Sequence, residues 1–246
     1  MTEAEARSWK LPALAGTPSL SMVPEAAQDG VPDFAFRFVE LPPVPGFRAF
    51  TRHGWHAAEL IVRDVDTLHA QLRDSSFEIV APPMDLSFCP DIRAMQIRGP
   101  GGEIIYLTEF KRPVPGLDAP VARCAVDRCF IVILGGPSMS AMQDYFGNQF
   151  GVPGSPPVES RVQTMALEFG LSREHRFPIA ALALNGQCYI EVDEMPSAAE
   201  SLPEILGDLP GGVAMVSFRV ATGSSTTGAP RCVRGGAGEL VELIAS

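Results

Sequence analysis

Positive charge is scarce in this sequence. Its 246 residues include 19 Lys or Arg against 29 Asp or Glu, which gives a formal net charge of −10. Nucleic-acid affinity comes mainly from basic side chains that neutralise phosphates. We therefore expect no nucleic-acid partner.

Long hydrophobic runs and paired cysteines are also missing. The longest apolar run, 129–134, is far shorter than the ~20 residues that a membrane helix needs. The first ten residues, MTEAEARSWK, are acidic and polar, unlike a secretory signal. The five cysteines contain no C-x-x-C pair, as is typical of reduced cytosolic thiols. We expect a cytoplasmic protein with no membrane partner.

Several well-known catalytic strings do not occur either. The sequence has no G-x-x-x-x-G-K-[ST], no H-E-x-x-H and no G-x-S-x-G, which disfavours nucleotide hydrolysis, zinc proteolysis and serine hydrolysis. What it has in quantity is 23 glycines and 23 prolines in a chain that is 46% hydrophobic. That composition favours short strands and turns around a sizeable core.

The most informative feature is an internal repeat. Residues 99–108 read GPGGEIIYLT and residues 235–244 read GGAGELVELI, which aligns Glu103 with Glu239. A weaker copy lies at 185–192. Each copy is a glycine-rich turn that leads into an alternating strand, so one supersecondary unit is used several times.

The clearest whole unit lies within 51–112. Asp64 is placed to cap a helix on which Val65, Leu68 and Leu72 share one face. The unit reads strand, helix, strand, strand, strand over 57–63, 65–72, 77–80, 92–97 and 103–109.

Other stretches predict further copies. One begins at 126, continues through a helix over roughly 138–150, and ends with a strand at 188–193. Another has strands at 212–220 and 239–245, but the segment between them is too polar and glycine-rich for the helix.

The front of the chain offers only a closing strand at 33–40, so the first and fourth units are both shortened. The proline-rich segment 111–124 is interpreted as a linker. We predict two domains of paired units, 1–112 and 126–246, joined by 113–125.

Three stretches, 57–66, 99–107 and 145–151, resemble the vicinal oxygen chelate superfamily, which includes glyoxalase I, bleomycin resistance proteins and extradiol dioxygenases. The resemblance implies an α+β fold of paired βαβββ modules, glyoxalase/bleomycin resistance/dioxygenase-like. It implies that each pair wraps a small-molecule cavity, which in that family often holds a divalent metal bound by His and Glu.

The family's histidine position falls on Ala57, and in later modules on Arg128 and Met215. Its glutamate position falls on Tyr106, Glu191, Glu242 and Arg37. Since no histidine occupies the first position, we expect no His-ligated metal and no other cofactor, while a Mg, Mn, Fe or Zn ion stays an open alternative.

Strand alternation gives a separate argument for two glutamates. If Ile190 and Val192 pack under a helix, then Tyr189 and Glu191 face inward, and the same alternation sends Glu242 inward. We expected Glu191 and Glu242 to exchange protons beside Arg128, which would hold an anionic oxygen. A structural salt bridge with Arg128 and a hard-cation site are the alternatives.

Glu59, Tyr106 and Arg37 form a second predicted set. On its strand Glu59 alternates to the inward face, together with Tyr106 and Arg37. The three side chains, and Tyr189, are predicted to bind substrate, and an internal ion pair is the alternative.

The sequence thus predicts a small-molecule enzyme of the vicinal oxygen chelate type that transfers protons, as an isomerase or lyase. A non-catalytic binding protein and a metal-dependent dioxygenase or glyoxalase are the alternatives. Because shortened units leave sheet edges open, we also expect a homodimer.

Overall fold

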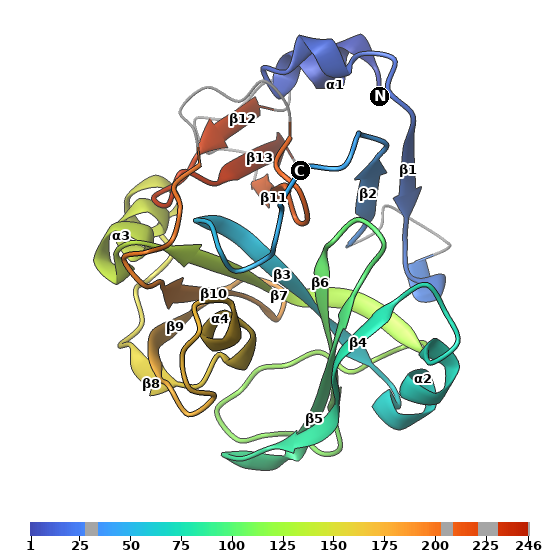
Figure 1. Ribbon diagram of the computed structural model, residues 1–246, viewed down its shortest axis with the longest axis vertical. Coiled ribbons are helices and arrows are strands. Elements are labelled where there is room, and N and C mark those ends of the chain that lie inside the picture. The colour runs from blue at the N-terminus through green and yellow to red at the C-terminus, as the bar shows by residue number, and fades with distance from the viewer. Residues whose placement is uncertain (28–33, 203–208, 221–230, 246) are drawn as a thin grey trace.

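The computed structural model of the chain describes residues 1–246 except 28–33, 203–208, 221–230 and 246. Its elements in chain order are α1 (Glu3–Ser8), η1 (Pro12–Leu14), β1 (Ser19–Met22), η2 (Glu25–Ala27), β2 (Phe36–Val39), β3 (Gly54–Val62), α2 (Val65–Leu72), β4 (Glu78–Leu86), β5 (Cys89–Arg98), β6 (Ile104–Phe110), β7 (Val126–Gly136), α3 (Met139–Phe150), β8 (Val158–Ser160), α4 (Gln163–Glu168), β9 (Phe177–Leu184), β10 (Cys188–Glu194), β11 (Met215–Val220), β12 (Arg231–Arg234) and β13 (Leu240–Ala245). Figure 1 shows a curled sheet with few helices, which confirms the α+β class.

Eight strands form the central sheet, in the order β4-β5-β6-β3-β7-β10-β9-β8. The elements β3, α2, β4, β5 and β6 make the predicted strand-helix-strand-strand-strand unit. The elements β7 to β10 repeat it, with α4 inserted between β8 and β9. In each unit the first strand runs parallel to the last, and the two units meet where β3 pairs antiparallel with β7.

The units pair differently from our expectation. We expected the unit within 51–112 to pair with the shortened first unit, yet it shares the central sheet with the third. Within its own unit, β3 pairs along one edge with β6, and β7 pairs along one edge with β10. The second edge of β3 and that of β7 then pair with each other. The domain boundaries 1–112, 113–125 and 126–246 stay a prediction, because strand pairing does not test which segments fold alone.

Two helices cover the outer face of this sheet. The side chain of Asp64 accepts a hydrogen bond from the Thr67 amide at the start of α2, and Ser138 does the same for Ala141 at the start of α3. The apolar side of α2 packs on β3, β5 and β6, while that of α3 packs on β7, β9 and β10. The helices predicted at 65–72 and 138–150 are therefore confirmed, and the opposite face of the sheet is the inward one.

The shortened first and fourth units lie beside the central sheet (Figure 1). The first is the antiparallel pair β1-β2, and the fourth is a sheet in the order β11-β13-β12. Arg37 on β2 contacts Glu242 on β13, with 2.9 Å between nitrogen and oxygen, so these two units meet. The sequence predicts that no helix follows β11. The segment concerned, 221–230, lies outside the described residues.

The two copies of the repeated turn have the same geometry. The Gly99 amide donates to the Glu103 carbonyl at 2.8 Å, and the Gly235 amide donates to the Glu239 carbonyl at 2.9 Å. A Cβ atom on either glycine would lie within 1.8 Å of the glutamate's Oε1. Each turn therefore needs glycine because a buried glutamate folds back over it.

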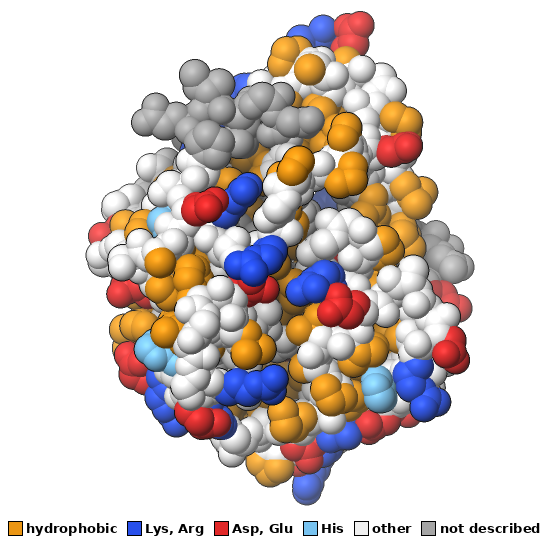
Figure 2. All heavy atoms as spheres, in the orientation of Figure 1, with side chains coloured by type: hydrophobic (Ala, Val, Ile, Leu, Met, Phe, Trp, Pro, Cys, Tyr) orange, Lys and Arg blue, Asp and Glu red, His pale blue; other side chains and the backbone are white. Residues whose placement is uncertain are grey.

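The surface gives two further observations. No helix in the described ranges is long and apolar enough to cross a membrane. On the face shown in Figure 2, basic and acidic side chains are interspersed and do not gather by sign. The expectations of a cytoplasmic homodimer without a nucleic-acid partner stay predictions.

Candidate functional site

The candidate site lies on the inward face of the central sheet, at the seam between the second and third units. In the parallel ladder of the second unit Tyr106 pairs with Glu59, and in that of the third unit Glu191 pairs with Ile133. Tyr106 and Glu191 thus occupy the same position in their units. Across the seam Glu59 pairs with Ile131, so side chains from both units converge there.

Part of the inward face is filled by the protein's own apolar side chains. Ala57, Ile104 and Ile133 pack there against Met165 of α4 and against Phe50, which precedes β3. Figure 1 shows α4 lying against the β9 and β10 part of the sheet. The cavity implied by the resemblance is therefore filled at these residues.

Polar side chains lie next to these apolar ones, because Glu191 pairs with Ile133 and Glu59 pairs with Tyr106 in the ladders of the same sheet. Glu59, Tyr106 and Glu191 are each half-buried, whereas Asp193, two residues beyond Glu191, has no exposed surface. The Thr108 hydroxyl donates to Glu59 Oε1 at 2.6 Å. The structure thus brings together Glu59, Tyr106 and Glu191, which the sequence had assigned to two separate pockets.

Removal from water raises the pKa of every acid in this group. Desolvation raises the pKa of Glu59 to about 7, although the hydrogen bond from Thr108 acts in the opposite direction. Desolvation also raises the pKa of Asp193 to about 7. The pKa of Glu191 is raised well above its usual value, first by desolvation and then by the nearby charges of Asp193 and Glu59. Because Glu191 and Asp193 interact strongly, their protons titrate as a pair.

Tyr106 completes the group as a neutral donor. Its pKa is raised well above the usual value by desolvation and then by the charges of Glu191, Asp193 and Glu59. The side chain of Thr164 on α4 acts in the opposite direction on this pKa and lowers it. A phenol that cannot ionise can still donate a hydrogen bond to a ligand oxygen.

Glu242 does not share this site, which corrects the expectation that it works beside Glu191. It lies on β13, outside the central sheet, and accepts hydrogen bonds from Trp9, Arg37 and Ser217. Arg37 was expected beside Glu59 and Tyr106 and is instead bound to Glu242. Alternation along each strand was interpreted correctly, but the two glutamates belong to different sheets.

Arg128 and Tyr189 also differ from expectation. A guanidinium nitrogen of Arg128 donates to the Gly186 carbonyl at 2.6 Å, so this group is engaged at the end of the hairpin. The Tyr189 hydroxyl contacts the backbone of Asp118 in the predicted linker, accepting from its amide at 3.2 Å. Neither contact brings a polar group to Glu191.

The position equivalent to Ala57 in the third unit is Ile131, not Arg128. Asp64 caps α2 and Ser138 caps α3, and each lies seven residues after the equivalent strand position.

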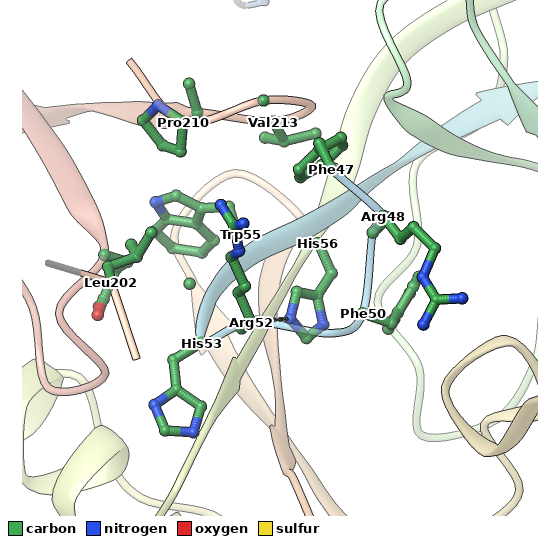
Figure 3. A pocket seen from close by; sticks show the side chains of 15 residues that line it. Phe47, Arg48, Phe50, Arg52, His53, Trp55, His56, Leu202, Pro210 and Val213 are labelled. Atoms are coloured by element: carbon green, nitrogen blue, oxygen red, sulfur yellow. Dashed lines mark hydrogen bonds between the residues drawn. The ribbon is translucent and has the colours of Figure 1, made fainter. Parts of the chain in front are cut away.

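A separate small cavity of about 20 Å³ lies where 47–56 meets 210–214 (Figure 3). Its lining includes His56 and Glu239, whose Nδ1 and Oε1 atoms are buried with no hydrogen-bond partner among the described residues. Desolvation lowers the pKa of His56 to about 4, so its ring is neutral at pH 7. The volume fits about one water molecule, which needs roughly 10–15 Å³. It is too small for a substrate.

Solved structures share this architecture, whereas no family model and no curated protein matches the sequence. Glyoxalase I from Zea mays aligns over 86% of this chain and 74% of its own, at 12% identity and a TM-score of 0.53. A provisionally assigned dioxygenase from Bacillus subtilis subsp. subtilis strain 168 aligns over 94% of this chain and 73% of its own, at 12% identity and a TM-score of 0.56. The chain has the vicinal oxygen chelate fold. This likeness establishes the architecture and leaves the chemistry to the residues.

The metal that accompanies the vicinal oxygen chelate fold in many proteins does not fit the residues here. The positions that the resemblance assigns to its ligands carry Ala57, Tyr106, Ile131 and Glu191. Two of these side chains have no donor atom, which leaves one phenol and one carboxylate, fewer than the three protein ligands of a catalytic zinc site. In the described part of the chain no three His, Cys, Asp or Glu side chains are grouped to hold a metal. The expectation of no cofactor stays a prediction.

Two residues of the site were given no role in the prediction. Strand alternation places Asp193 on the same inward face of β10 as Tyr189 and Glu191, but it was not named as a site residue. Thr108 alternates with Tyr106 in the same way on β6, and its hydroxyl reaches Glu59. The helix α4 was also not predicted, because it is short and has no side-chain N-cap.

Proposed function

We propose that this protein is a small-molecule enzyme that moves a proton on an oxygenated substrate, as an isomerase or lyase, at the inward seam of the central sheet. One observation carries the proposal: Glu59 and Glu191 lie half-buried on the same inward face, where desolvation raises the pKa of Glu59 to about 7 and that of Glu191 well above its usual value. Acid–base catalysis is most efficient when the catalytic pKa lies near the working pH.

The carboxyl groups and the phenol fit different roles in this reaction. A carboxylate of the Glu59–Glu191 pair takes a proton from a carbon next to a carbonyl, and the electron pair of that C–H bond becomes an enolate. Tyr106 donates a hydrogen bond to the enolate oxygen, which stabilises the charge as it forms. The protonated carboxyl then returns a proton to the same carbon, on either face of the enolate, which re-forms the C–H bond and the carbonyl, so the balance of protons is zero.

Solvent exchange tests this chemistry without knowledge of the natural substrate. The protein is incubated in deuterium oxide with phenylpyruvate, 2-oxobutyrate or ethyl acetoacetate, and loss of the C–H signal beside the carbonyl is followed by proton NMR. We expect enzyme-dependent exchange that falls by about 10²-fold or more in Glu191→Gln, in line with the usual contribution of a general base.

Glu78→Gln is the matched control, because Glu78 is an exposed strand carboxylate paired with Arg98. This variant should exchange at the wild-type rate. Absence of exchange with all three compounds, or equal rates in Glu191→Gln and wild type, would contradict the proposal.

A non-catalytic binding protein is the second candidate, and the apolar residues Ala57 and Ile131 at two of the four ligand positions favour it. Binding of phenylpyruvate without exchange, with affinity lost in Glu191→Gln, would support this candidate. The metal-dependent alternative predicts stoichiometric Fe, Mn, Ni or Zn in the purified protein, which elemental analysis would detect.

A further inference from the structure

The fourth unit carries a carboxylate at the same position as Glu191. In the parallel ladder of β11 and β13, Glu242 pairs with Ser217, as Glu191 pairs with Ile133 and Tyr106 with Glu59. The repeated turn supports the same equivalence, because Tyr106 lies three residues after Glu103 and Glu242 lies three residues after Glu239. Glu242 is therefore the inward residue of the pair formed by the first and fourth units.

Side-chain donors surround this carboxylate. Trp9 Nε1 donates to Glu242 Oε1 at 2.6 Å, Arg37 donates to Oε2 at 2.9 Å, and the Ser217 hydroxyl donates to Oε2 at 2.5 Å. The side chain of Glu242 is only 4% exposed. Two of the donors belong to the first and fourth units themselves, whereas Trp9 comes from the segment before β1.

The indole of Trp9 contacts both Glu242 and Arg37. Besides the hydrogen bond from its N–H, the guanidinium carbon of Arg37 lies 4.3 Å from the centre of its ring, which is a cation–π contact. Apolar side chains, including Leu240 and Cys232, complete its surroundings, and Trp9 is 5% exposed. An apolar enclosure with a few placed polar groups is the usual make-up of a small-molecule site.

The comparison with the central sheet shows what is particular here. There, α4 packs on apolar side chains of the inward face, and Glu191 is half-buried. In the other pair, α1 packs on Leu240 in the same way, but Trp9 extends over the carboxylate itself. Lys10, directly after Trp9, has a left-handed φ of 61°, which non-glycine residues rarely adopt. The chain is thus turned sharply at the point where Trp9 enters the site.

We propose that the inward face of the β11-β13-β12 sheet is a second ligand site, which takes a planar aromatic compound with a ring N–H, and that Trp9 occupies it in the free protein. The carboxylate of Glu242 recognises the N–H, and Arg37 covers the face of the ring. A ligand of this class binds by displacing the indole of Trp9. This site is independent of the proposed chemistry at Glu191, so either proposal can fail alone.

The first experiment opens the site in the full chain and uses 5-fluoroindole as the probe. Fluorine NMR should show saturable binding to Trp9→Gly. N-methyl-5-fluoroindole, which cannot donate, should bind about tenfold or more weakly, the difference that one hydrogen bond to a charged group makes. The double variant Trp9→Gly/Glu242→Leu, which has no acceptor at 242, should lose this preference. Equal affinity for the two probes in Trp9→Gly would overturn the proposal.

The second experiment uses the wild-type chain, so it does not depend on the folding of a variant. The indole N–H resonance of Trp9, assigned by its absence in Trp9→Phe, is followed during titration with 5-fluoroindole. We expect it to move to the position of a solvent-exposed indole, while the resonance of Trp55, which donates to the Leu240 carbonyl, stays unchanged. A Trp9 resonance unmoved by excess probe would show that Trp9 is a permanent part of the core, and would overturn the proposal.

Discussion

Replacement of Asp193 by Asn should change how the stability of this protein depends on pH. Asp193 has no exposed surface, neither of its oxygens has a hydrogen-bond partner among the described residues, and its folded-state pKa is about 7 against an ordinary value of 3.8. The folded chain therefore keeps a proton on Asp193 that the unfolded chain has already lost. Stability from this proton is fully present below pH 3.8 and disappears as the pH rises to about 7.

The size of the effect follows from the interval between the two pKa values. From about pH 5.5 to about pH 7 the unfolded carboxyl is ionised and the folded one is not, so ~1.5 pH units at ~1.4 kcal/mol each amount to about 2 kcal/mol. Between about pH 5.5 and about pH 8, the free energy of unfolding of wild type should fall by this amount relative to that of Asp193→Asn.

The assay is denaturant unfolding followed by tryptophan fluorescence at the two pH values, for wild type and Asp193→Asn. The difference between the proteins matters because His56 titrates in the opposite sense and is common to both. Asp144→Asn, an exposed helix position, is the control and should leave the wild-type pH dependence unchanged. If Asp193→Asn keeps the full pH dependence of wild type, our account of the buried carboxyl is wrong.

Two further predictions concern His56 and its neighbours. The folded-state pKa of His56 is about 4 against 6.5, so its stabilising effect is present above pH 6.5 and is lost as the pH falls to 4. Relative to His56→Phe, wild type should lose about 3 kcal/mol over that range, measured by unfolding at each pH, and a constant difference would contradict this. Gly135→Ala should lower the free energy of unfolding by about 1–3 kcal/mol, because a Cβ there would lie 2.0 Å from the His56 ring and 2.7 Å from Met195 Sδ. Gly147→Ala, in a helix with room for the methyl group, should raise it by about 0.5–1 kcal/mol, and equal effects of the two alanines would refute the steric argument.

Local sequence patterns predicted the units and the faces of their strands. Asp64 caps α2 as expected, and the turns at Glu103 and Glu239 have the same hydrogen bonds. Alternation placed Glu59 and Glu191 on the inward face because a strand's side-chain period is two, whatever its neighbours are. These features depend on residues close together in sequence.

The arrangement of the units could not be predicted, because it depends on which strand edges meet. Alternation predicts that Glu191 and Glu242 lie on the inward face of a sheet, but it does not predict to which sheet each belongs. The assignment of Arg128 allowed for a longer loop before α3, whereas seven residues before the Ser138 cap, the spacing from Ala57 to Asp64, lies Ile131. Trp9 has no local pattern that indicates a partner 233 residues away.

That sequence separation has a consequence for synthesis of the chain. Trp9 leaves the ribosome long before Glu242 exists, and at about 5–20 residues per second the delay is on the order of ten to fifty seconds. Until β13 has been made, the indole and the apolar side of α1 have no surface on which to dock. The beginning of the chain is therefore among the last parts to reach its native place, and a chaperone has time to hold it while the central sheet assembles.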